Sequence, residues 1–335
     1  MLGKWRDVQR SAGYIRFVFL GKENTEMSIL VVGSVAFDSV ETPFGKAHNV
    51  LGGSAAYFST SASFFTDVNI VAVVGEDFPQ EHIDFLASRG IDLQGLARDP
   101  GKTFHWEGRY GYDLNEAHTL ATHLNVFESF KPRIPSSYAD SDYLFLANID
   151  PDLQMDVLRQ VNNPKIIASD TMNYWISSKP ESLRTVVKNV DILIINDAEA
   201  RQLSQEPNLV KAARKLLDIG VKTLIVKRGE YGVLMFNGSS VFSAPAYPLE
   251  EVFDPTGAGD TFAGGFMGYL ANTGDISDDG IRKAIIFGSV MASFTVEDFS
   301  LNRLKKLNYR EIEERYRSLK AMTHFEGLPE MGISV

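Results

Sequence analysis

The fold of this chain is decided by the stretch D-P-T-G-A-G-D-T-F-A-G-G-F, which runs from Asp254 to Phe266. Its glycines stand where a helix begins, because the next residues, M-G-Y-L-A, continue a helical pattern. Glycine destabilises a helix interior by about 1 kcal/mol relative to alanine, so these glycines need a reason. At a helix N-terminus they leave backbone N–H groups unobstructed by a Cβ, and the helix dipole adds positive partial charge there. The stretch therefore predicts an anion cradle formed by Gly257, Ala258 and Gly259.

Asp260 falls in the first turn of this helix, which we expect over residues 258–272. A carboxylate at this position has two interpretations. It stabilises the helix dipole, worth about 0.3–1 kcal/mol, or it is a base beside the anion site that takes a hydroxyl proton as a phosphoryl group arrives. Gly264, Gly265 and Gly268 have a separate explanation, which is close packing of this helix against the sheet or a neighbouring helix.

The composition limits the class of protein. Of the 335 residues, 44% are hydrophobic and 23% are charged, and 33 basic against 43 acidic residues give a formal net charge of −10. This balance does not favour a nucleic-acid partner. The chain has no cysteine, which removes disulfides and thiolate metal sites and suits a reducing cytoplasm. It also has no apolar run of about eighteen residues, so we expect a cytoplasmic protein without a membrane partner.

Short apolar runs alternate with helical segments along the chain. The runs are rich in Val, Ile and Leu without polar alternation, which is typical of parallel strands covered on both faces. We expect such strands at 29–32, 69–74, 143–147, 165–168, 191–195 and 223–226, and a hairpin of 233–236 with 240–243 around Asn237-Gly238. We expect helices near 53–65, 78–89, 151–161, 179–188, 197–203, 207–219, 258–272, 278–296 and 308–322. The alternation predicts an α/β fold with a doubly wound, mostly parallel sheet.

Two segments, at about 35–50 and 103–127, interrupt this alternation. The second carries aromatic residues at even positions, namely Phe104, Trp106, Tyr110 and Tyr112. Such alternation indicates strands with one apolar face. We expect the two segments to form a small β-sheet that acts as a lid over the main domain or as a dimer contact.

Met27 opens the first clean strand pattern. We therefore expect one domain over residues 27–325 and a C-terminal tail over 326–335. Residues 1–26 are either a disordered appendage outside the fold or an extra edge element packed on the domain.

The stretch Gly101-Lys102-Thr103 looks like the end of a phosphate-binding P-loop, but its spacing is wrong. The P-loop has four residues between its first glycine and Gly-Lys, whereas five residues separate Gly95 from Gly101 here. A P-loop also opens a helix, and the following Phe104-His105-Trp106 has a strand pattern. We interpret the stretch as a turn into the lid.

The sequence Asp-Pro-Thr-Gly-Ala-Gly-Asp-Thr-Phe, followed by a helix of small residues, strongly resembles the C-terminal signature of the PfkB family of carbohydrate kinases, in the ribokinase-like superfamily. Three other motifs occur in family order after Met27: Gly52-Gly53 opening a helix, Asn196-Asp197-Ala198-Glu199 after a strand, and Lys227-Arg228-Gly229 at a strand end. The resemblance implies a three-layer αβα sandwich with a small β lid. It also implies an enzyme that uses ATP and Mg²⁺ to phosphorylate a hydroxymethyl group of a sugar or nucleoside.

The resemblance implies a role for each matching residue around the phosphates. Asp260 would be the catalytic base, and the N–H groups of the Gly257-Ala258-Gly259 cradle would hold the oxygens of the moving phosphoryl group. Asn196 and Glu199 would lie near Mg²⁺, mostly through water, with a helix cap as the alternative. The other residues expected on the nucleotide side are Lys227, Gly229, Gly232, Thr256 and Ser289. The stretch Asp170-Thr171-Met172-Asn173-Tyr174-Trp175 either borders the phosphate site or forms a turn held by side-chain hydrogen bonds.

On the acceptor side, Asp38 matches the family's sugar-binding aspartate, and Gly52 and Gly53 would let the acceptor approach the backbone. The chain departs from ribokinase at Ala36 and Tyr57, where ribokinase-like members carry asparagines that contact sugar hydroxyls. Ribose itself is therefore not favoured, and Tyr57 would stack on a ring or donate a hydrogen bond. Further candidates for acceptor contacts are Asn148, His105, Trp106 and Arg109, with a packed lid face as the alternative for the lid aromatics.

Three functions stay open at this point. The first is a kinase of a small sugar or related polyol. The second is an adenosine-type nucleoside kinase, with Tyr57, Phe44 or Trp106 as an aromatic slot for the base. The third is a binding or regulatory family member without catalysis, which the intact Asp260 and cradle glycines disfavour.

The sequence says little about metals and assembly. His118 and His123 are five residues apart, a spacing that shares a face on neither a helix nor a strand, so no transition-metal site is expected. We expect a monomer or a homodimer that forms through the lid.

Overall fold

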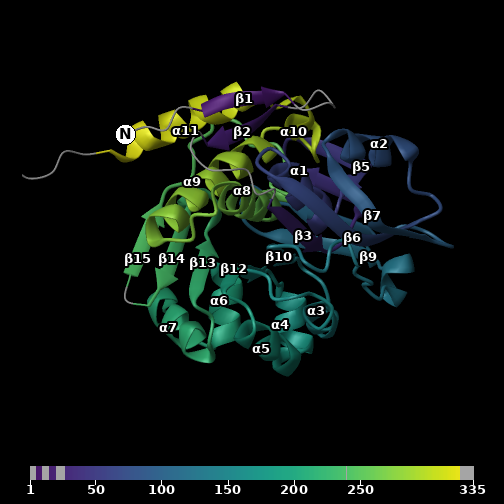
Figure 1. Cartoon of the computed structure of the whole chain (residues 1–335), viewed down its shortest axis with the longest axis horizontal. Helices are drawn as coiled ribbons and strands as arrows, with labels where there is room; N and C mark the ends of the chain where they lie inside the picture. Colours follow the sequence, from purple (N-terminus) through teal and green to yellow (C-terminus); the bar gives the residue numbers. More distant parts are fainter. Residues whose placement is uncertain (1–4, 10–14, 20–26, 239, 325–335) are drawn as a thin grey trace, which may run out of the picture.

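A computed structural model of the chain describes residues 5–9, 15–19, 27–238 and 240–324. Two short strands, β1 (Trp5–Gln9) and β2 (Ile15–Phe19), pair antiparallel, and β2 lies next to the helices α8 and α11 (Figure 1). The remainder of 1–26 and the expected tail at 326–335 lie outside the described residues. We expect residues 1–26 to be dispensable for activity, which remains a prediction.

A nine-stranded sheet forms the centre of the molecule (Figure 1). Its strands from β13 to β7 run parallel, and the hairpin of β14 and β15 extends it antiparallel. In spatial order the strands are β15 (Ser240–Ala244), β14 (Val233–Asn237), β13 (Thr223–Lys227), β12 (Ile192–Asn196), β11 (Ile166–Ser169), β10 (Tyr143–Leu146), β3 (Ser28–Val32), β6 (Asp67–Gly75) and β7 (Ile91–Asp99). The mostly parallel sheet is confirmed, but β7 at its edge was not predicted.

Both faces of this sheet are buried, because successive residues of a strand point to opposite sides. In β3, Ile29 and Val31 belong to one apolar cluster, and Leu30 and Val32 belong to the other. The first cluster is covered by α1 (Ser54–Ala62), α2 (Gln80–Ser88), α8 (Ala258–Thr273), α9 (Asp278–Thr295), α10 (Asn302–Lys306) and α11 (Tyr309–Thr323). The second is covered by α3 (Pro151–Leu158), α4 (Asn173–Ser178), α5 (Pro180–Lys188), α6 (Asp197–Ser204) and α7 (Leu209–Ile219). The three-layer αβα arrangement is therefore confirmed.

Helix α8 is buried between α1 and α9, and its glycines make this packing possible. A Cβ on Gly264 would lie 2.3 Å from the carbonyl oxygen of Phe58 in α1. A Cβ on Gly265 would lie 2.8 Å from Cγ of Met291 in α9. The predicted close packing of α8 is confirmed, and it fixes the N-terminus of this helix against the sheet.

The lid is a separate four-stranded sheet in the order β5-β4-β8-β9. It is built from β4 (Ala36–Thr42) and β5 (Gly45–Gly52) of the first expected segment, and from β8 (His105–Tyr110) and β9 (Ala117–His123) of the second. Strands β4 and β8 pair in parallel at the centre of this sheet, which joins the two segments into one unit. The expected β lid is confirmed.

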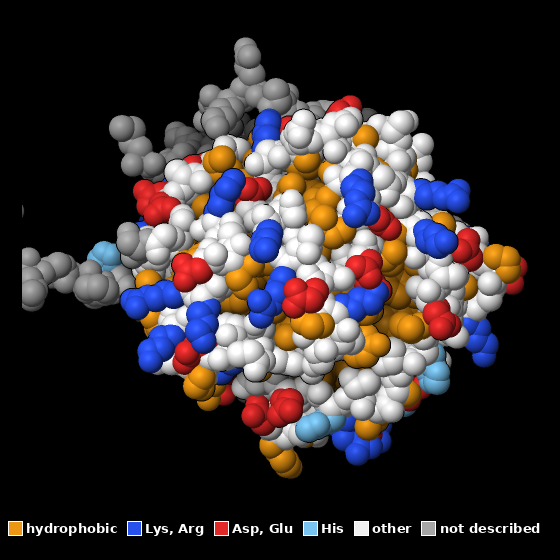
Figure 2. All heavy atoms as spheres, turned by 90° about the horizontal axis from the view of Figure 1, so that it is seen from below, with side chains coloured by type: hydrophobic (Ala, Val, Ile, Leu, Met, Phe, Trp, Pro, Cys, Tyr) orange, Lys and Arg blue, Asp and Glu red, His pale blue; other side chains and the backbone are white. Residues whose placement is uncertain are grey.

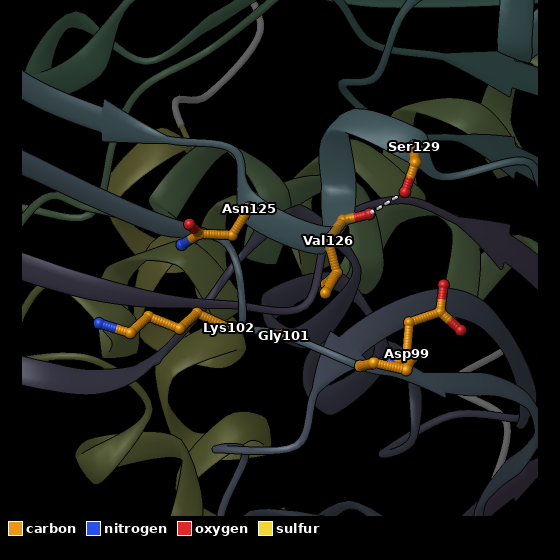
Figure 3. Close-up of a pocket in the computed structure, with 7 residues that line it drawn as sticks. Asp99, Gly101, Lys102, Asn125, Val126 and Ser129 are labelled. Carbon is orange, nitrogen blue, oxygen red and sulfur yellow. Dashed lines mark hydrogen bonds between the residues drawn. The ribbon is translucent and has the colours of Figure 1, made fainter.

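The turn before β8 is not a P-loop. The hydroxyl of Thr103 donates to Asp77 at 2.7 Å and accepts from the N–H of Gly75 at 3.0 Å, so this threonine is held within the fold. Lys102 of this turn lines a pocket together with three residues of the 3₁₀ helix η1 (Asn125–Ser129), namely Asn125, Val126 and Ser129 (Figure 3). The chain then enters β8, as predicted.

Candidate active site

The N-terminus of α8 has the expected open geometry. Gly257 precedes the helix in the left-handed region, with φ of 74°, and no side chain of the described residues caps the helix start. The N–H of Thr261 donates to the carbonyl of Gly257 at 2.8 Å, and the N–H of Ala258 donates to the carbonyl of Pro255 at 3.1 Å. The helix start is therefore uncapped as expected, but the N–H of Ala258 has an internal partner, and anion binding by Gly257, Ala258 and Gly259 stays a prediction.

The cradle glycines also bring two side chains to the helix start. A Cβ on Gly257 would lie 2.4 Å from three ring carbons of Tyr57, and a Cβ on Gly259 would lie 2.8 Å from Nζ of Lys227. The ring of Tyr57 and the ammonium group of Lys227 thus occupy space that only glycine leaves open. An anion at this helix terminus would meet an aromatic ring on one side and a cation on the other.

Lys227 joins the helix start to a group of buried carboxylates. Its Nζ lies 3.4 Å from Oδ2 of Asp170, and both side chains are largely buried. Burial, and then the charge of Asp170, raises the pKa of Asp260 to about 7, although Lys227 opposes this shift. Burial, and then the charge of Asp170, likewise raises the pKa of Glu199 to about 8. The same charges hold the pKa of Lys227 above its ordinary value in spite of its burial.

Asn196 and Glu199 form a capping box at the start of α6. The amide oxygen of Asn196 accepts from the N–H of Glu199, and Oε2 of Glu199 accepts from the N–H of Asn196, both at 2.8 Å. The alternative interpretation of this motif, a helix cap, therefore describes what the structure shows. The cap also fixes the Glu199 carboxyl group in the site, where a role near a cation stays a prediction.

Other residues expected on the nucleotide side lie on two elements. Gly229 opens the 3₁₀ helix η2 (Gly229–Tyr231) after β13, and Gly232 closes it, both with positive φ. Ser289 lies on α9 and is buried, and its hydroxyl has no hydrogen-bond partner among the described residues. Buried polar atoms are rarely left unpaired, so this hydroxyl marks a place where a ligand atom would fit.

The acceptor side is built around Asp38 on β4. A Cβ on Gly52 would lie 2.0 Å from Oδ2 of Asp38, so the carboxylate lies directly against this glycine. The N–H of Gly53, which precedes α1 with φ of 93°, bonds to the carboxylate. Burial, followed by the charges of Asp254 and Asp260, raises the pKa of Asp38 to about 8. The residues predicted for acceptor and base therefore interact electrostatically.

Two further acceptor candidates have unpaired polar atoms. The hydroxyl of Tyr57 and Oδ1 of Asn148, just after β10, are buried and have no hydrogen-bond partner among the described residues. A ligand with hydroxyl groups would satisfy both atoms. The structure therefore keeps Tyr57 and Asn148 as candidates.

The lid directly reaches the loop before α8, here called the catalytic loop (residues 254–257) after its predicted role. The hydroxyls of Tyr110 in β8 and Thr256 lie 3.3 Å apart, so Thr256 contacts the lid. In the loop after β8, the side chain of Asn115 lies against Gly229, since a Cβ on this glycine would lie 1.7 Å from its Oδ1. The lid hairpin thus touches the loop before α8 and the turn after β13 at once.

Two lid residues expected to contact the acceptor face the other way. His105 lies 2.9 Å from the hydroxyl of Ser39, and Arg109 forms an ion pair with Glu41 at 3.3 Å. These residues alternate with Asp38 and Tyr110 along the paired strands β4 and β8, so they belong to the opposite face. The expectation of acceptor contacts is therefore not supported for His105 and Arg109.

Comparison with known proteins identifies this arrangement. The model of the pfkB family carbohydrate kinases matches residues 18–306, which includes nine residues before Met27. The chain belongs to the PfkB family. Its members are ATP-dependent phosphotransferases, and this chain is a sugar or nucleoside kinase of that family.

Several relatives of this PfkB kinase are nucleoside kinases. A cytidine kinase of Thermococcus kodakarensis is 33% identical over 72% of this chain and 87% of its own length. A nucleoside kinase of Methanothermobacter thermautotrophicus is 27% identical over 82% of this chain and 90% of its own. Among solved structures, a putative ribokinase II of E. coli in complex with ATP and Mg²⁺ has a TM-score of 0.74 at 19% identity, covering 87% of this chain and 99% of that one. This last likeness shows the ribokinase-like fold.

The residues of this PfkB kinase fit ATP and Mg²⁺. The uncapped start of α8 and the ammonium group of Lys227 suit phosphate oxygens, and the unpaired hydroxyls of Ser289 and Thr171 are places for polar ligand atoms. Glu199 and Asp170 supply carboxylate oxygens, which hard cations prefer. No group of three or more His, Asp or Glu residues in the described part of the chain is arranged to hold a metal ion alone.

Sequence reasoning missed three residues of this PfkB site. Asp170 was only placed near the phosphates, yet its charge acts on Asp260, Glu199 and Lys227. Asp254 shapes the catalytic loop by accepting from the N–H groups of Thr256 at 2.9 Å and of Ser300 at 3.3 Å. Tyr110 was read only as part of an apolar lid face. The position of Asp170 after a buried strand was the one available signal, because strand ends meet at one sheet edge.

Two surface properties complete the description. On the face drawn in Figure 2, acidic and basic side chains are interspersed and do not gather into one basic surface. None of the helices within the described ranges combines the length and the apolar character that a membrane crossing requires.

Proposed function

We propose that this chain is an ATP- and Mg²⁺-dependent nucleoside kinase that phosphorylates the 5′-hydroxymethyl group of a ribonucleoside. The observation that carries the proposal is the position of Asp260. It lies partly buried at the uncapped start of α8, within electrostatic reach of Asp170 and Lys227 on one side and of Asp38 on the other. A base in this position can serve an acceptor held by Asp38 and a phosphoryl group held by the helix start.

The proton and the phosphoryl group follow a simple path in this proposal. Asp260 accepts the proton of the 5′-hydroxyl group, and the oxygen forms a bond to the γ-phosphorus of ATP. ATP supplies the phosphoryl group, and its bond to the β,γ-bridging oxygen breaks to release ADP. A pKa of about 7 suits this task, because a general base works best when its pKa lies near the working pH.

Charge stabilisation falls to the helix start and Lys227. The N–H groups of Gly257 and Gly259 and the dipole of α8 would bind oxygens of the moving phosphoryl group, while the N–H of Ala258 would first have to leave the carbonyl of Pro255. Lys227 would neutralise charge that moves toward the leaving oxygen. Its buried ion pair with Asp170 keeps the ammonium group over Gly259, so it needs little reorganisation during the reaction.

The remaining nucleotide contacts extend from this centre. We assign Glu199, held by Asn196, to the hydration shell of Mg²⁺. We assign the turn of Gly229 and Gly232 to the nucleotide phosphates, and Ser289 to the adenosine end. Thr256 faces the lid through Tyr110 and is assigned to closure of the site.

A nucleoside acceptor is favoured by the names of the relatives and by the residues of the acceptor side. Three relatives match more than two thirds of this chain: one is named cytidine kinase, one nucleoside kinase, and one, at 24% identity, 2-dehydro-3-deoxygluconokinase. A relative named ribokinase, from Staphylococcus aureus, is also 33% identical but over only 32% of this chain. Ala36 and Tyr57 replace the asparagines expected for a ribokinase, and Asp38 can accept hydroxyls from ribose in either compound. A free sugar is therefore the second candidate acceptor.

Release of ADP tests the proposal. Purified protein with ATP and Mg²⁺ is given cytidine, other ribonucleosides, pentoses, hexoses and inositols, and the Asp260→Asn variant serves as the blank. We expect at least one ribonucleoside to exceed the blank by about 100-fold or more, the lower range for loss of a general base. Turnover of a sugar alone would make the chain a carbohydrate kinase. No turnover with any acceptor, together with normal ATP binding, would support the non-catalytic alternative.

A further inference from the structure

The inner face of the lid carries an aromatic residue next to the carboxylate of the acceptor site. Strands β4 and β8 pair Asp38 with Trp106 and Val40 with Gly108. Because side chains alternate along a strand, Asp38, Trp106, Gly108 and Tyr110 share one face. Tyr110 contacts Thr256 of the catalytic loop from this face, so it is the face that looks into the site.

Trp106 is held in one orientation on this face. A Cβ on Gly108 would lie 2.0 Å from Cη2 and 2.4 Å from Cζ2 of Trp106, so the six-membered ring covers the Cα of this glycine. The indole N–H donates to the hydroxyl of Thr119 in β9 at 3.2 Å. Glycine weakens a strand interior and there marks a close approach. The strand therefore accepts Gly108 in order to seat the indole ring.

The seated indole is not part of the buried core. Trp106 retains partial exposure, whereas Asp38 beside it is buried. A large apolar ring that is fixed on one side and partly exposed on the other offers a surface for stacking. A ribonucleoside carries hydroxyl groups on its ribose and a flat base joined to that ribose by one single bond, which matches a carboxylate and an indole on neighbouring strands. A free pentose has no ring system to stack.

We propose that Trp106 is the platform on which the base of the acceptor nucleoside stacks, and that Gly108 is required because it seats this platform. The proposal rests on the nucleoside kinase function proposed above. It makes Trp106 a specificity-determining residue that separates nucleosides from free sugars, while the chemistry stays with Asp260. Stacking tolerates different bases, since each has a π face, so Trp106 selects a nucleoside but not a particular base.

Substitution of Trp106 tests the platform. We expect Trp106→Ala to lower kcat/KM for cytidine about 10- to 100-fold, mainly through KM, because stacking on an aromatic residue contributes in this range. Trp106→Phe should retain most of the activity. Gly108→Ala should reproduce the loss while keeping the tryptophan, because the added methyl group displaces the ring.

A matched control and a binding readout complete the experiment. Trp175→Ala removes another partly exposed tryptophan, whose ring packs edge-on against Tyr174 at 4.8 Å, and should leave kcat/KM for cytidine unchanged. With Trp5 and Trp175 replaced by Phe, cytidine should quench the fluorescence of Trp106 and ribose should not. Full cytidine turnover in a folded Trp106→Ala variant would overturn the platform alone. Absence of nucleoside turnover in the unmodified enzyme, with a sugar phosphorylated instead, would overturn the proposed function and the platform with it.

Discussion

At the scale of single residues, the site depends on charges that are kept out of water. Asp38 and Glu199 are buried carboxyl groups and Asp260 is partly buried, and the pKa of each is raised to between about 7 and about 8. Burial raises the pKa of a carboxyl group and so favours its neutral form, whereas the charge of Lys227 lowers the pKa of Asp260 and Glu199. The balance places the pKa of the proposed base near neutrality, where it can take a proton and return it within each turnover.

Replacement of Asp260 by asparagine tests the role of the base. We expect kcat to fall about 100- to 10,000-fold, the range for loss of a general base, because the amide cannot accept the proton. The melting temperature should stay the same or rise, since the change removes a partly buried carboxylate and keeps its shape. Steady-state kinetics and thermal unfolding measure the two effects. Retained turnover with a large loss of stability would assign Asp260 to structure.

Replacement of Asp170 by asparagine tests the electrostatic link. The charge of Asp170 raises the pKa of Asp260, so its removal should lower that pKa. The base is then deprotonated at lower pH, and the acid limb of kcat/KM, expected near pH 7 in the unmodified enzyme, should move to lower pH. The pH profile of both proteins checks this. If the acid limb lies at the same pH in both proteins, the ionisation that produces it does not belong to Asp260.

At the scale of elements, the start of α8 combines an unusual backbone with close neighbours. Gly257 before the helix and Gly274 after it both adopt the left-handed conformation, with φ of 74° and 60°. Their surroundings differ, because the ring of Tyr57 lies against Gly257. The need for a left-handed residue therefore occurs once inside the site, at Gly257, and once outside it, at Gly274.

This pair of glycines gives a controlled experiment. Both Gly257→Ala and Gly274→Ala should destabilise the protein by about 1–2 kcal/mol, the cost of a left-handed alanine. Only Gly257→Ala should also abolish most turnover, since its methyl group would displace Tyr57 and distort the cradle. Chemical denaturation and ADP release measure the two effects. Equal activity of the two variants would show that the cradle tolerates a side chain.

The elements also show what the sequence could predict. Apolar runs and turn residues located the central strands, and alternating aromatics located the lid, because both patterns are local. The edge strand β7 was missed because its sequence, I-D-L-Q-G-L-A-R-D, is polar and half exposed. Family motifs placed Asp260, Asp38 and Glu199. The central position of Asp170 and the contact of Tyr110 with Thr256 arise only when distant segments meet, so no local pattern contains them.

At the scale of the whole molecule, the buried carboxyl groups link stability to pH. Their pKa values are raised in the folded state, so this state binds more protons than the unfolded chain between about pH 4 and pH 8. The free energy of unfolding should therefore fall as pH rises through this window. The melting temperature of the ligand-free protein should be lower at pH 8.5 than at pH 5.5.

Asp38→Asn should reduce this pH dependence. The pKa of Asp38 is about 8 in the folded protein, so its removal should raise the melting temperature by an amount that grows from about pH 4 to about pH 8. A gain of 1 kcal/mol corresponds to roughly 2–4 °C for a protein of this size class. Calorimetry across pH checks the slope. An unchanged slope would show that Asp38 is not buried as a neutral acid.

The N-terminal stretch is tested by deletion. A chain that starts at Met27 keeps the nine-stranded sheet and the lid, so we expect its kcat and KM to match those of the full chain. The melting temperature should also be similar. An insoluble or inactive product would show that the strands β1 and β2 belong to the folding unit.

The contacts of the lid hairpin with Thr256 and Gly229 have a kinetic consequence. The same hairpin contacts the loop before α8 and the turn after β13, so a single opening motion of the lid would uncover both segments. Lid opening limits the turnover rate of such an enzyme when it is slower than the chemical step. Thickening the solvent with glycerol or sucrose would then slow turnover in proportion to viscosity. Tyr110→Phe would remove the hydroxyl contact with Thr256 and should reduce the dependence of turnover on viscosity.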